Sequence, residues 1–248
     1  MIYRYFIELS FDGTRYSGWQ VQRNGLSVQQ ILNEKLSFKL SEKIEVTGAG
    51  RTDAGVHSEF FVAHFDTKTL LNENFISEMN GFLPTDIVFH KIRKVNSEAH
   101  ARFSAVSRTY QYRITTKKNP FLNNFSFYYH GKLDIELMNK AALILLSVSD
   151  FTSFSKLHGN TKTNICIVTK AEWEQCGDNL IFTISANRFL RNMVRAITGT
   201  LLDVGKGKIS IDQFVEIIES NNRSKASTSA PAKGLFLCSI NYPNSIYL

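Results

Sequence analysis

The order in which two hydrophobic periods follow each other constrains the fold of this chain more than any other feature. Residues 2–11 alternate between apolar and polar side chains, which is the period of a strand with one buried face. The apolar face of that strand would hold Tyr3, Tyr5, Ile7, Leu9 and Phe11. Ser27 and Gln30 then form a capping-box pattern, and apolar residues at helical spacing predict a helix over 28–40.

The segments that follow complete a familiar order of elements. Strands are predicted over 44–47 and 60–66, with a helix over 74–82 and another strand over 86–95. The order is therefore β-α-β-β-α-β, which is the split ferredoxin-like arrangement.

The second part of the chain repeats this pattern of elements without repeating the sequence. The predicted elements are a strand through Tyr110, Tyr112 and Ile114, a helix capped by Asp134, strands over 164–174 and 179–186, helices over 189–203 (ending at Gly205) and 211–220, and a strand over 235–242. We therefore expect an α+β fold with two similar ferredoxin-like halves, residues 1–105 and 106–248. Their sheets would be largely antiparallel, with helices mainly on one face and an active-site cleft between the halves.

Composition narrows the class of protein. The 248 residues are 43% hydrophobic and 21% charged, as in a soluble globular protein, and the formal net charge of +7 favours a polyanionic partner. Nucleic acid and an anionic membrane surface both fit that charge. We expect no transmembrane helix and no signal peptide, because no apolar run is long enough and the chain opens on a strand pattern. The three widely spaced cysteines indicate reduced thiols in a cytoplasmic protein rather than a zinc site.

A glycine-rich stretch, Gly48 to Ser58, is the strongest candidate for chemistry. It lies between two predicted strands and carries Arg51, Asp53 and His57 among three glycines, which permit sharp turns and close approach to a ligand. The structural alternative is a tight turn in which Asp53 bonds backbone amides and Arg51 is solvated. Spacing alone leaves both interpretations open.

Other loops suit a polyanion. The loop after residue 12 mixes aromatic, amide and cationic side chains, a combination that suits RNA, although Trp19 could instead be tucked inward. Basic side chains also occur in the predicted loops 116–127, 150–163 (with Lys156, His158 and Lys162) and 220–234. They could contact phosphates or simply be solvated.

Several motifs together resemble one known family. Gly50-Arg51-Thr52-Asp53-Ala54-Gly55-Val56-His57 resembles the signature of the TruA family of tRNA pseudouridine synthases. Further blocks that resemble the family, in the family's order, are Gly18-Trp19-Gln20-Val21-Gln22, His100-Ala101-Arg102-Phe103-Ser104-Ala105, Arg108-Thr109-Tyr110, Phe151-Thr152-Ser153-Phe154, Phe189-Leu190 with Met193-Val194-Arg195, and Ala230-Pro231-Ala232-Lys233-Gly234-Leu235. The departure is local: Ser58-Glu59-Phe60-Phe61 stands where the family usually has a small residue and a Gly-Gln pair.

The resemblance implies a function and a set of site residues. It implies isomerisation of uridine to pseudouridine at positions 38, 39 and 40 in the anticodon stem-loop of tRNA, by a homodimer. The reaction takes no electrons or atoms from outside, so it requires no cofactor. Asp53 would be the nucleophile, paired with Arg195 from the other half, and Tyr110 would stack on the uracil. Arg51 could face the same side as Asp53, and Arg102 would help to extrude the base or hold the backbone.

The residues alone also permit plainer roles. Tyr110 could pack in the core with its strand neighbours, and Arg195, on one helical face with Arg191, could reach from an apolar stripe into solvent. Nothing in the sequence gives His57 a proton to move, so we expect it to be structural or to lie behind the site.

Two further functions compete with isomerisation. One is a catalytically inactive RNA-binding module of the same fold, against which the presence of Asp53, Tyr110 and Arg195 argues. The other is a hydrolase that uses Asp53 at a phosphate or glycoside. Metal-dependent phosphate chemistry would require clustered carboxylates, and most glycosidases require two, whereas Glu59 is the only near neighbour of Asp53.

Overall fold

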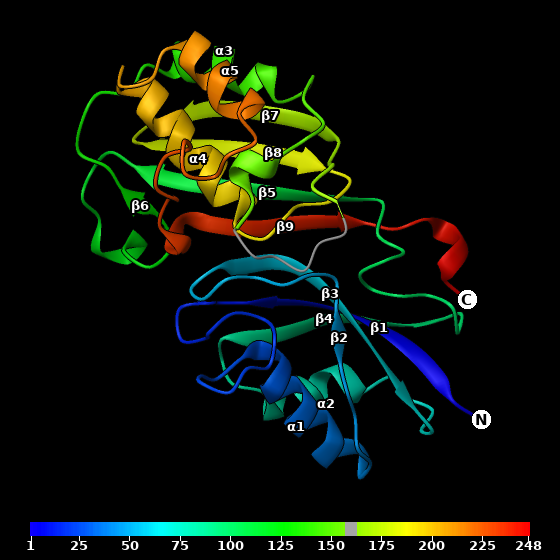
Figure 1. The fold of residues 1–248 in the computed structure, drawn as a ribbon. Coiled ribbons are helices and arrows are strands. Elements are labelled where there is room, and N and C mark those ends of the chain that lie inside the picture. Colours follow the sequence, from blue (N-terminus) through cyan, green and yellow to red (C-terminus); the bar gives the residue numbers. More distant parts are fainter. Residues whose placement is uncertain (157–162) are drawn as a thin grey trace. The chain divides into compact units, whose positions relative to one another are not determined.

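The computed structural model describes residues 1–156 and 163–248, which form two compact units. Unit 1 contains Met1–Val106 together with Leu237–Leu248, and unit 2 contains Ser107–Phe236. The described residues form a mixed α+β structure with largely antiparallel strands and five α-helices (Figure 1). None of the described helices has the length and apolar character needed to cross a membrane.

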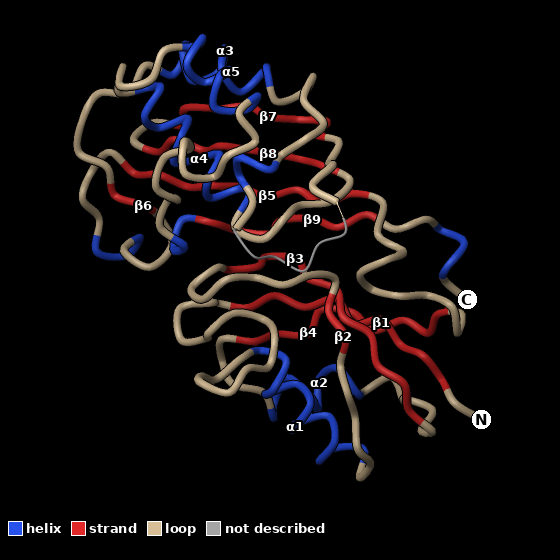
Figure 2. Tube along the Cα trace, in the orientation of Figure 1, coloured by secondary structure: helices blue, strands red, loops and turns tan. Residues whose placement is uncertain are grey.

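Unit 1 follows the predicted order of elements. These elements are β1 (Tyr3–Phe11), α1 (Val28–Leu40), β2 (Thr47–Gly48), β3 (His57–Thr67), α2 (Phe75–Phe82), β4 (Ile87–Val95) and the end of β9 (Leu235–Asn241). The strands lie in the order β4-β1-β3-β9, and β2 pairs with β3 (Figure 2). The pairings of β1 with β3 and β4, and of β2 with β3, are antiparallel. The predicted apolar face of β1 is confirmed for Tyr5, Ile7, Leu9 and Phe11, which are buried.

The segment before β2 corrects a sequence prediction. Residues 44–46 were expected to form a strand, but β2 contains only Thr47–Gly48. The backbone groups of 44–46 are bonded instead by side chains of α1. Ser37 Oγ accepts from Ile44 N–H (2.8 Å), Asn33 Oδ1 accepts from Val46 N–H (2.8 Å), and Gln29 Nε2 donates to the Val46 carbonyl (2.7 Å). A segment whose donors and acceptors are bonded by a helix has no need of a strand partner.

The start of α1 is capped by only half of the predicted capping box. Ser27 Oγ accepts from Gln30 N–H at 3.2 Å, as expected. The Gln30 side chain, however, donates to Glu34 Oε1 at 2.9 Å, one turn further along the helix. The complete reciprocal box occurs at α5 (Ile211–Glu219), between Ser210 and Gln213.

Unit 2 contains the remaining elements. These are β5 (Ser107–Thr115), β6 (Phe127–Tyr128), α3 (Ile135–Ile144), β7 (Val168–Cys176), β8 (Asn179–Ala186), α4 (Met193–Gly205), α5 and the start of β9. The strand order is β5-β8-β7 with antiparallel pairs, whereas the short, unpredicted β6 pairs with β5 in parallel. Asp134 caps α3 as predicted, since its Oδ1 accepts from Leu137 N–H at 2.8 Å.

Helix α4 begins and ends later than predicted. Asn192 precedes it with a left-handed φ of 66°, so Arg191 lies outside the helix and does not share a helical face with Arg195. The helix continues through Gly205, and Gly207, with φ of 69°, takes the left-handed conformation after it. Gly205 is needed for packing, because a Cβ there would overlap the side chain of Met138 in α3.

The predicted division into residues 1–105 and 106–248 differs from the observed units at the C-terminal end. Residues 237–248 belong to unit 1, where Val106 N–H donates to the Asn241 carbonyl (2.8 Å) and Ser58 Oγ donates to the Leu237 carbonyl (3.1 Å). Of the basic loop predicted over 150–163, His158 and Lys162 lie outside the described residues.

Candidate active site

Asp53 lies in the turn between β2 and β3, at the centre of the glycine-rich stretch. Its side chain is half-buried, and its backbone carbonyl accepts from Val56 N–H at 3.2 Å. Gly55 takes a positive φ of 74° and donates its N–H to the Tyr16 carbonyl at 3.3 Å. The turn therefore holds Asp53 against a second loop, residues 12–18.

The 12–18 loop contacts the Asp53 turn through backbone atoms, and two glycines permit this. A Cβ at Gly13 would overlap the Val56 carbonyl, and a Cβ at Gly18, where φ is 93°, would overlap the Thr52 carbonyl. Gly13 N–H also donates to His57 Nδ1 at 3.1 Å. Because two backbones meet with no side chain between them, the position of the Asp53 turn depends on the 12–18 loop.

Asp86, the residue before β4, anchors the 12–18 loop. Its carboxylate accepts from Tyr16 Oη (2.6 Å) and Arg15 Nε (2.8 Å), and its carbonyl accepts from Asp12 N–H (3.0 Å). Burial, followed by the bond to Asp86, raises the pKa of Tyr16. Arg15 and Tyr16, which the sequence placed in an RNA-suited loop, thus have structural partners within the protein.

His57 lies at the start of β3 and behind the Asp53 turn. Its side chain is 2% exposed, and its Nδ1 lies 3.1 Å from Asp12 Oδ1 as well as accepting from Gly13 N–H. A ring so enclosed contacts protein groups rather than solvent, as the structural role expected for His57 requires.

Arg51 is oriented by a relay of two glutamines. Arg51 Nε donates to Gln20 Oε1 (3.3 Å), and Gln20 Nε2 donates in turn to Gln29 Oε1 (2.9 Å). Gln29 projects from α1, and its amide nitrogen, Nε2, donates to the Val46 carbonyl. The exposed guanidinium of Arg51 is therefore supported by a residue of a packed helix.

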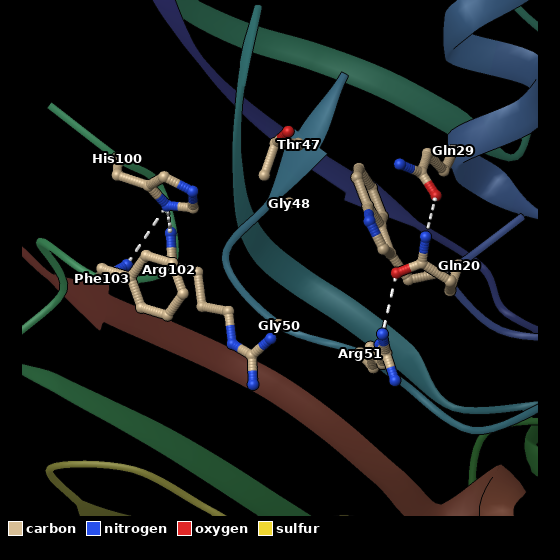
Figure 3. Close-up of a pocket in the computed structure, with 10 residues that line it drawn as sticks. Gln20, Gln29, Thr47, Gly48, Gly50, Arg51, His100, Arg102 and Phe103 are labelled. Carbon is tan, nitrogen blue, oxygen red and sulfur yellow. Dashed lines mark hydrogen bonds between the residues drawn. The ribbon is translucent and has the colours of Figure 1, made fainter. Parts of the chain in front are cut away.

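Arg51 and Arg102 line the same hollow in unit 1. Figure 3 shows Arg51, Gln20 and Gln29 on one side of the segment Thr47–Gly50, and His100, Arg102 and Phe103 on the other. Trp19 also borders the hollow, but it is 1% exposed and stacks on Phe61 with ring centroids 4.1 Å apart. The inward alternative for Trp19 is therefore correct.

Tyr110 and Arg195 lie in unit 2. Tyr110, in β5, is half-buried and meets Phe189 edge-to-face at 5.1 Å. Tyr112, the next residue on its face, is fully buried and donates its hydroxyl to the Pro231 carbonyl (2.8 Å). Arg195 Nε donates to the adjacent Ala230 carbonyl, also at 2.8 Å. Burial raises the pKa of Tyr112 although the nearby Arg195 acts to lower it.

The predicted site residues therefore fall into two groups. Asp53, Arg51 and Arg102 belong to unit 1, whereas Tyr110 and Arg195 belong to unit 2. The pairing of Arg195 with Asp53 joins residues of different units and stays a prediction.

Comparison with known proteins decides the family. A family model described as tRNA pseudouridine synthase matches residues 9–104 and 141–243. The chain belongs to the tRNA pseudouridine synthase family. The match includes Asp53, Arg51, Arg102 and Arg195, whereas Tyr110 falls between its two segments.

Curated members of this family resemble the chain over nearly its full length. A "tRNA pseudouridine synthase A" from Bacteroides fragilis is 53% identical, with 99% of each chain covered. Proteins of the same name from Bacteroides thetaiotaomicron and Acetivibrio thermocellus are 51% and 37% identical, covering 98% and 94% of this chain and 92% and 97% of their own. Among solved structures, a dye-decolorizing protein from V. cholerae is 8% identical over 98% of this chain and 94% of its own, with a TM-score of 0.19, too low to bear on the fold.

Three residues of this family member contribute contacts that sequence reasoning missed. Gln29 and Asp86 form hydrogen bonds to residues outside their own elements, and no local sequence pattern marks either residue. Phe103 belongs to the family-like motif from His100 to Ala105, in which only Arg102 was predicted to be a site residue. Its position beside Arg102 in a family motif was a signal that could have identified it.

A buried histidine beside His100, which lines the hollow in unit 1, predicts that the stability of the protein depends on pH. His64 is 7% exposed, its Nδ1 accepts from Ala101 N–H (3.1 Å), and its ring lies 4.7 Å from that of His100. Burial, with His100 and Arg4, lowers the pKa of His64 to about 4. Between that value and the pKa of about 6.5 in the unfolded chain, the unfolded state binds more protons, so stability falls as pH falls.

We expect the wild type to lose more unfolding free energy than His64→Asn between pH 7.5 and pH 5. The asparagine amide keeps an acceptor for Ala101 N–H but is not protonated in this pH range. The free energy of unfolding that the variant loses therefore reports the other titrating groups. Urea unfolding at the two pH values measures both losses. Equal losses in the two proteins would show that His64 does not carry this pH dependence.

Proposed function

We propose that this chain isomerises uridine to pseudouridine at positions 38, 39 and 40 in the anticodon stem-loop of tRNA, with Asp53 as the nucleophile. The observation that carries the proposal is the match to the tRNA pseudouridine synthase family across the glycine-rich stretch that holds Asp53. The half-buried position of Asp53, in a turn fixed by backbone contacts, supports its role.

The reaction needs few groups, and the chain offers candidates for them. The C–N glycosidic bond breaks, the base turns, a C–C bond forms at C5, the C5 proton leaves and N1 gains a proton. A carboxylate that forms a covalent intermediate divides this change into two easier steps. We assign that carboxylate to Asp53 and propose that Arg195 pairs with it.

The other predicted residues would hold the substrate. An extruded base loses its stacking neighbours and needs a new platform. We assign this to Tyr110, whose half-buried ring is positioned edge-on by Phe189. Arg51 and Arg102, on one hollow of unit 1, are assigned to extrusion of the base and to the RNA backbone.

We further propose the organisation around this chemistry. Unit 1 would carry the nucleophile and unit 2 would supply Tyr110 and Arg195. Each unit would be a ferredoxin-like half, which the order β4-β1-β3 with β2 on β3 supports for unit 1. The protein would act as a cytoplasmic homodimer.

Release of tritium from C5-labelled uridine in unmodified tRNA tests the proposed function. We expect release by the wild type without added metal, and we expect the modified positions, mapped by carbodiimide treatment and reverse transcription, to be 38, 39 and 40. Absence of release with intact tRNA binding would favour the inactive RNA-binding module instead.

The net charge of +7 predicts salt-sensitive binding. Neutralising phosphates releases counterions, so tRNA affinity should fall at least about tenfold between 50 and 200 mM salt. Fluorescence anisotropy with labelled tRNA measures this fall. An affinity that stays constant over that range would remove the argument from the basic surface.

A further inference from the structure

We propose that the hollow in unit 1 binds an unpaired nucleotide of the tRNA that neighbours the target uridine. Its base would stack on Phe103, and its phosphate would lie between Arg51 and Arg102. This inference rests on the proposed function for its ligand, but it concerns a nucleotide other than the one that reacts.

Phe103 is an exposed aromatic side chain on a turn that is held rigidly. The side chain is 75% exposed. His100 Nδ1 accepts from the N–H groups of Arg102 (3.1 Å) and Phe103 (3.3 Å). Ser104 closes the turn, because its N–H donates to the His100 carbonyl (2.9 Å) and its Oγ accepts from His100 N–H (3.0 Å). A platform ordered before binding loses little conformational freedom when a base stacks on it.

Aromatic rings support Phe103 from behind. The His100 ring lies 4.4 Å from that of Phe103 at an interplanar angle of 38°, and the His64 ring lies 4.7 Å from that of His100. Burial, with Arg4 and Arg102, lowers the pKa of His100. The imidazole is therefore neutral at pH 7, and its Nδ1 can keep accepting from the turn.

Cationic groups stand on both sides of the hollow. Arg102 belongs to the same turn, with its guanidinium 5.5 Å from the Phe103 ring centre. Arg51 faces from the other side and is oriented by the Gln20–Gln29 relay (Figure 3). An aromatic platform next to cationic groups is the arrangement that binds single-stranded nucleic acid, by stacking and by attraction of the phosphate.

The position of the hollow indicates which nucleotide it would take. Asp53 follows Arg51 by two residues, a span of at most about 7 Å of extended chain. A nucleotide held at Arg51 and a uridine at Asp53 would therefore be close neighbours on one strand. The hollow would hold the nucleotide next to whichever of the three uridines reaches Asp53.

Equilibrium binding of unmodified tRNA tests the stacking platform. We expect Phe103→Leu to weaken binding about tenfold, or about 1.4 kcal/mol, because a stacked base contributes about that much or more. Phe103→Trp should bind within about threefold of the wild type, since the platform is retained. Phe38→Leu is the matched control, because Phe38 in α1 is also 75% exposed but does not border the hollow, and it should bind as the wild type does.

A second pair of variants, one in the hollow and one outside it, tests the phosphate contact. Arg102→Gln should weaken tRNA binding and reduce the slope of log affinity against log salt by about one. Lys43→Gln removes the same charge from an exposed ion pair with Glu45 and should leave that slope unchanged. Equal slopes for Arg102→Gln and the wild type would overturn the phosphate assignment.

A set of tRNAs, each lacking one base within three nucleotides of the mapped target, identifies the partner of Phe103. At one position, loss of the base should weaken wild-type binding about tenfold and leave Phe103→Leu unaffected. Additive losses at every position, or wild-type affinity of Phe103→Leu, would overturn the subsite.

Pseudouridine formation by the wild type, measured on the same tRNA, separates the two proposals. Product formation together with additive losses would refute the subsite alone. A lack of product would refute the proposed function. Coupling between Phe103 and one base would establish the subsite with or without turnover.

Discussion

Asp53→Asn is expected to lower the rate of pseudouridine formation by more than about four orders of magnitude, because an amide cannot replace a carboxylate nucleophile. Affinity for tRNA should stay within about tenfold, or about 1.4 kcal/mol, since most of the binding would come from other groups. Single-turnover tritium release and equilibrium binding measure the two quantities separately.

Asp178→Asn is a suitable control, since it makes the same change at an exposed carboxylate between β7 and β8 and should leave the rate unchanged. Near wild-type turnover by Asp53→Asn would refute the nucleophile assignment. A large loss of tRNA affinity would instead indicate that Asp53 holds the binding surface together.

Gly18→Ala is expected to destabilise the protein by more than about 3 kcal/mol and to abolish activity. The added Cβ would overlap the Thr52 carbonyl, and the φ of 93° is itself unfavourable for alanine. Moving the backbone to relieve the overlap would displace the turn that holds Asp53. Urea unfolding and tritium release check the two effects.

Gly177→Ala separates the cost of the backbone conformation from the cost of the overlap. Gly177 has φ of 60°, and a Cβ there would meet nothing within 4 Å. Its substitution should therefore cost only about 1–2 kcal/mol and preserve activity. Equal destabilisation by the two substitutions would show that contact between the 12–18 loop and the Asp53 turn is unimportant.

Much of the fold could be predicted from hydrophobic period alone. The strand 179–186 and the helix 74–82 appear within a residue of their predicted bounds, because each has a clear period and a clear stop. Residues 44–46 could not be predicted in this way, since their backbone bonds go to Ser37, Asn33 and Gln29. A period shows which face is buried, but it does not show which side chain from another element reaches the backbone.

The candidate site, too, could be predicted only in part from the sequence. The resemblance pointed to Asp53, Arg51 and Arg102 through contiguous motifs, and the structure adds the residues that hold them. Asp86 anchors the 12–18 loop from about 70 positions away along the chain, as its bond to Tyr16 shows. Such a contact depends on tertiary docking, and a single sequence carries no sign of it.

The division of β9 between the two units has a consequence for how the chain is made. A ribosome adds residues from the N-terminus onward, so residues 107–236 are synthesised before the strand that lies beside β3 in unit 1. Until then the nascent first unit keeps one strand edge without its final partner, and such edges are sites where chains associate wrongly. Unit 1 therefore completes its folding after translation of unit 2, although it comes first in the sequence.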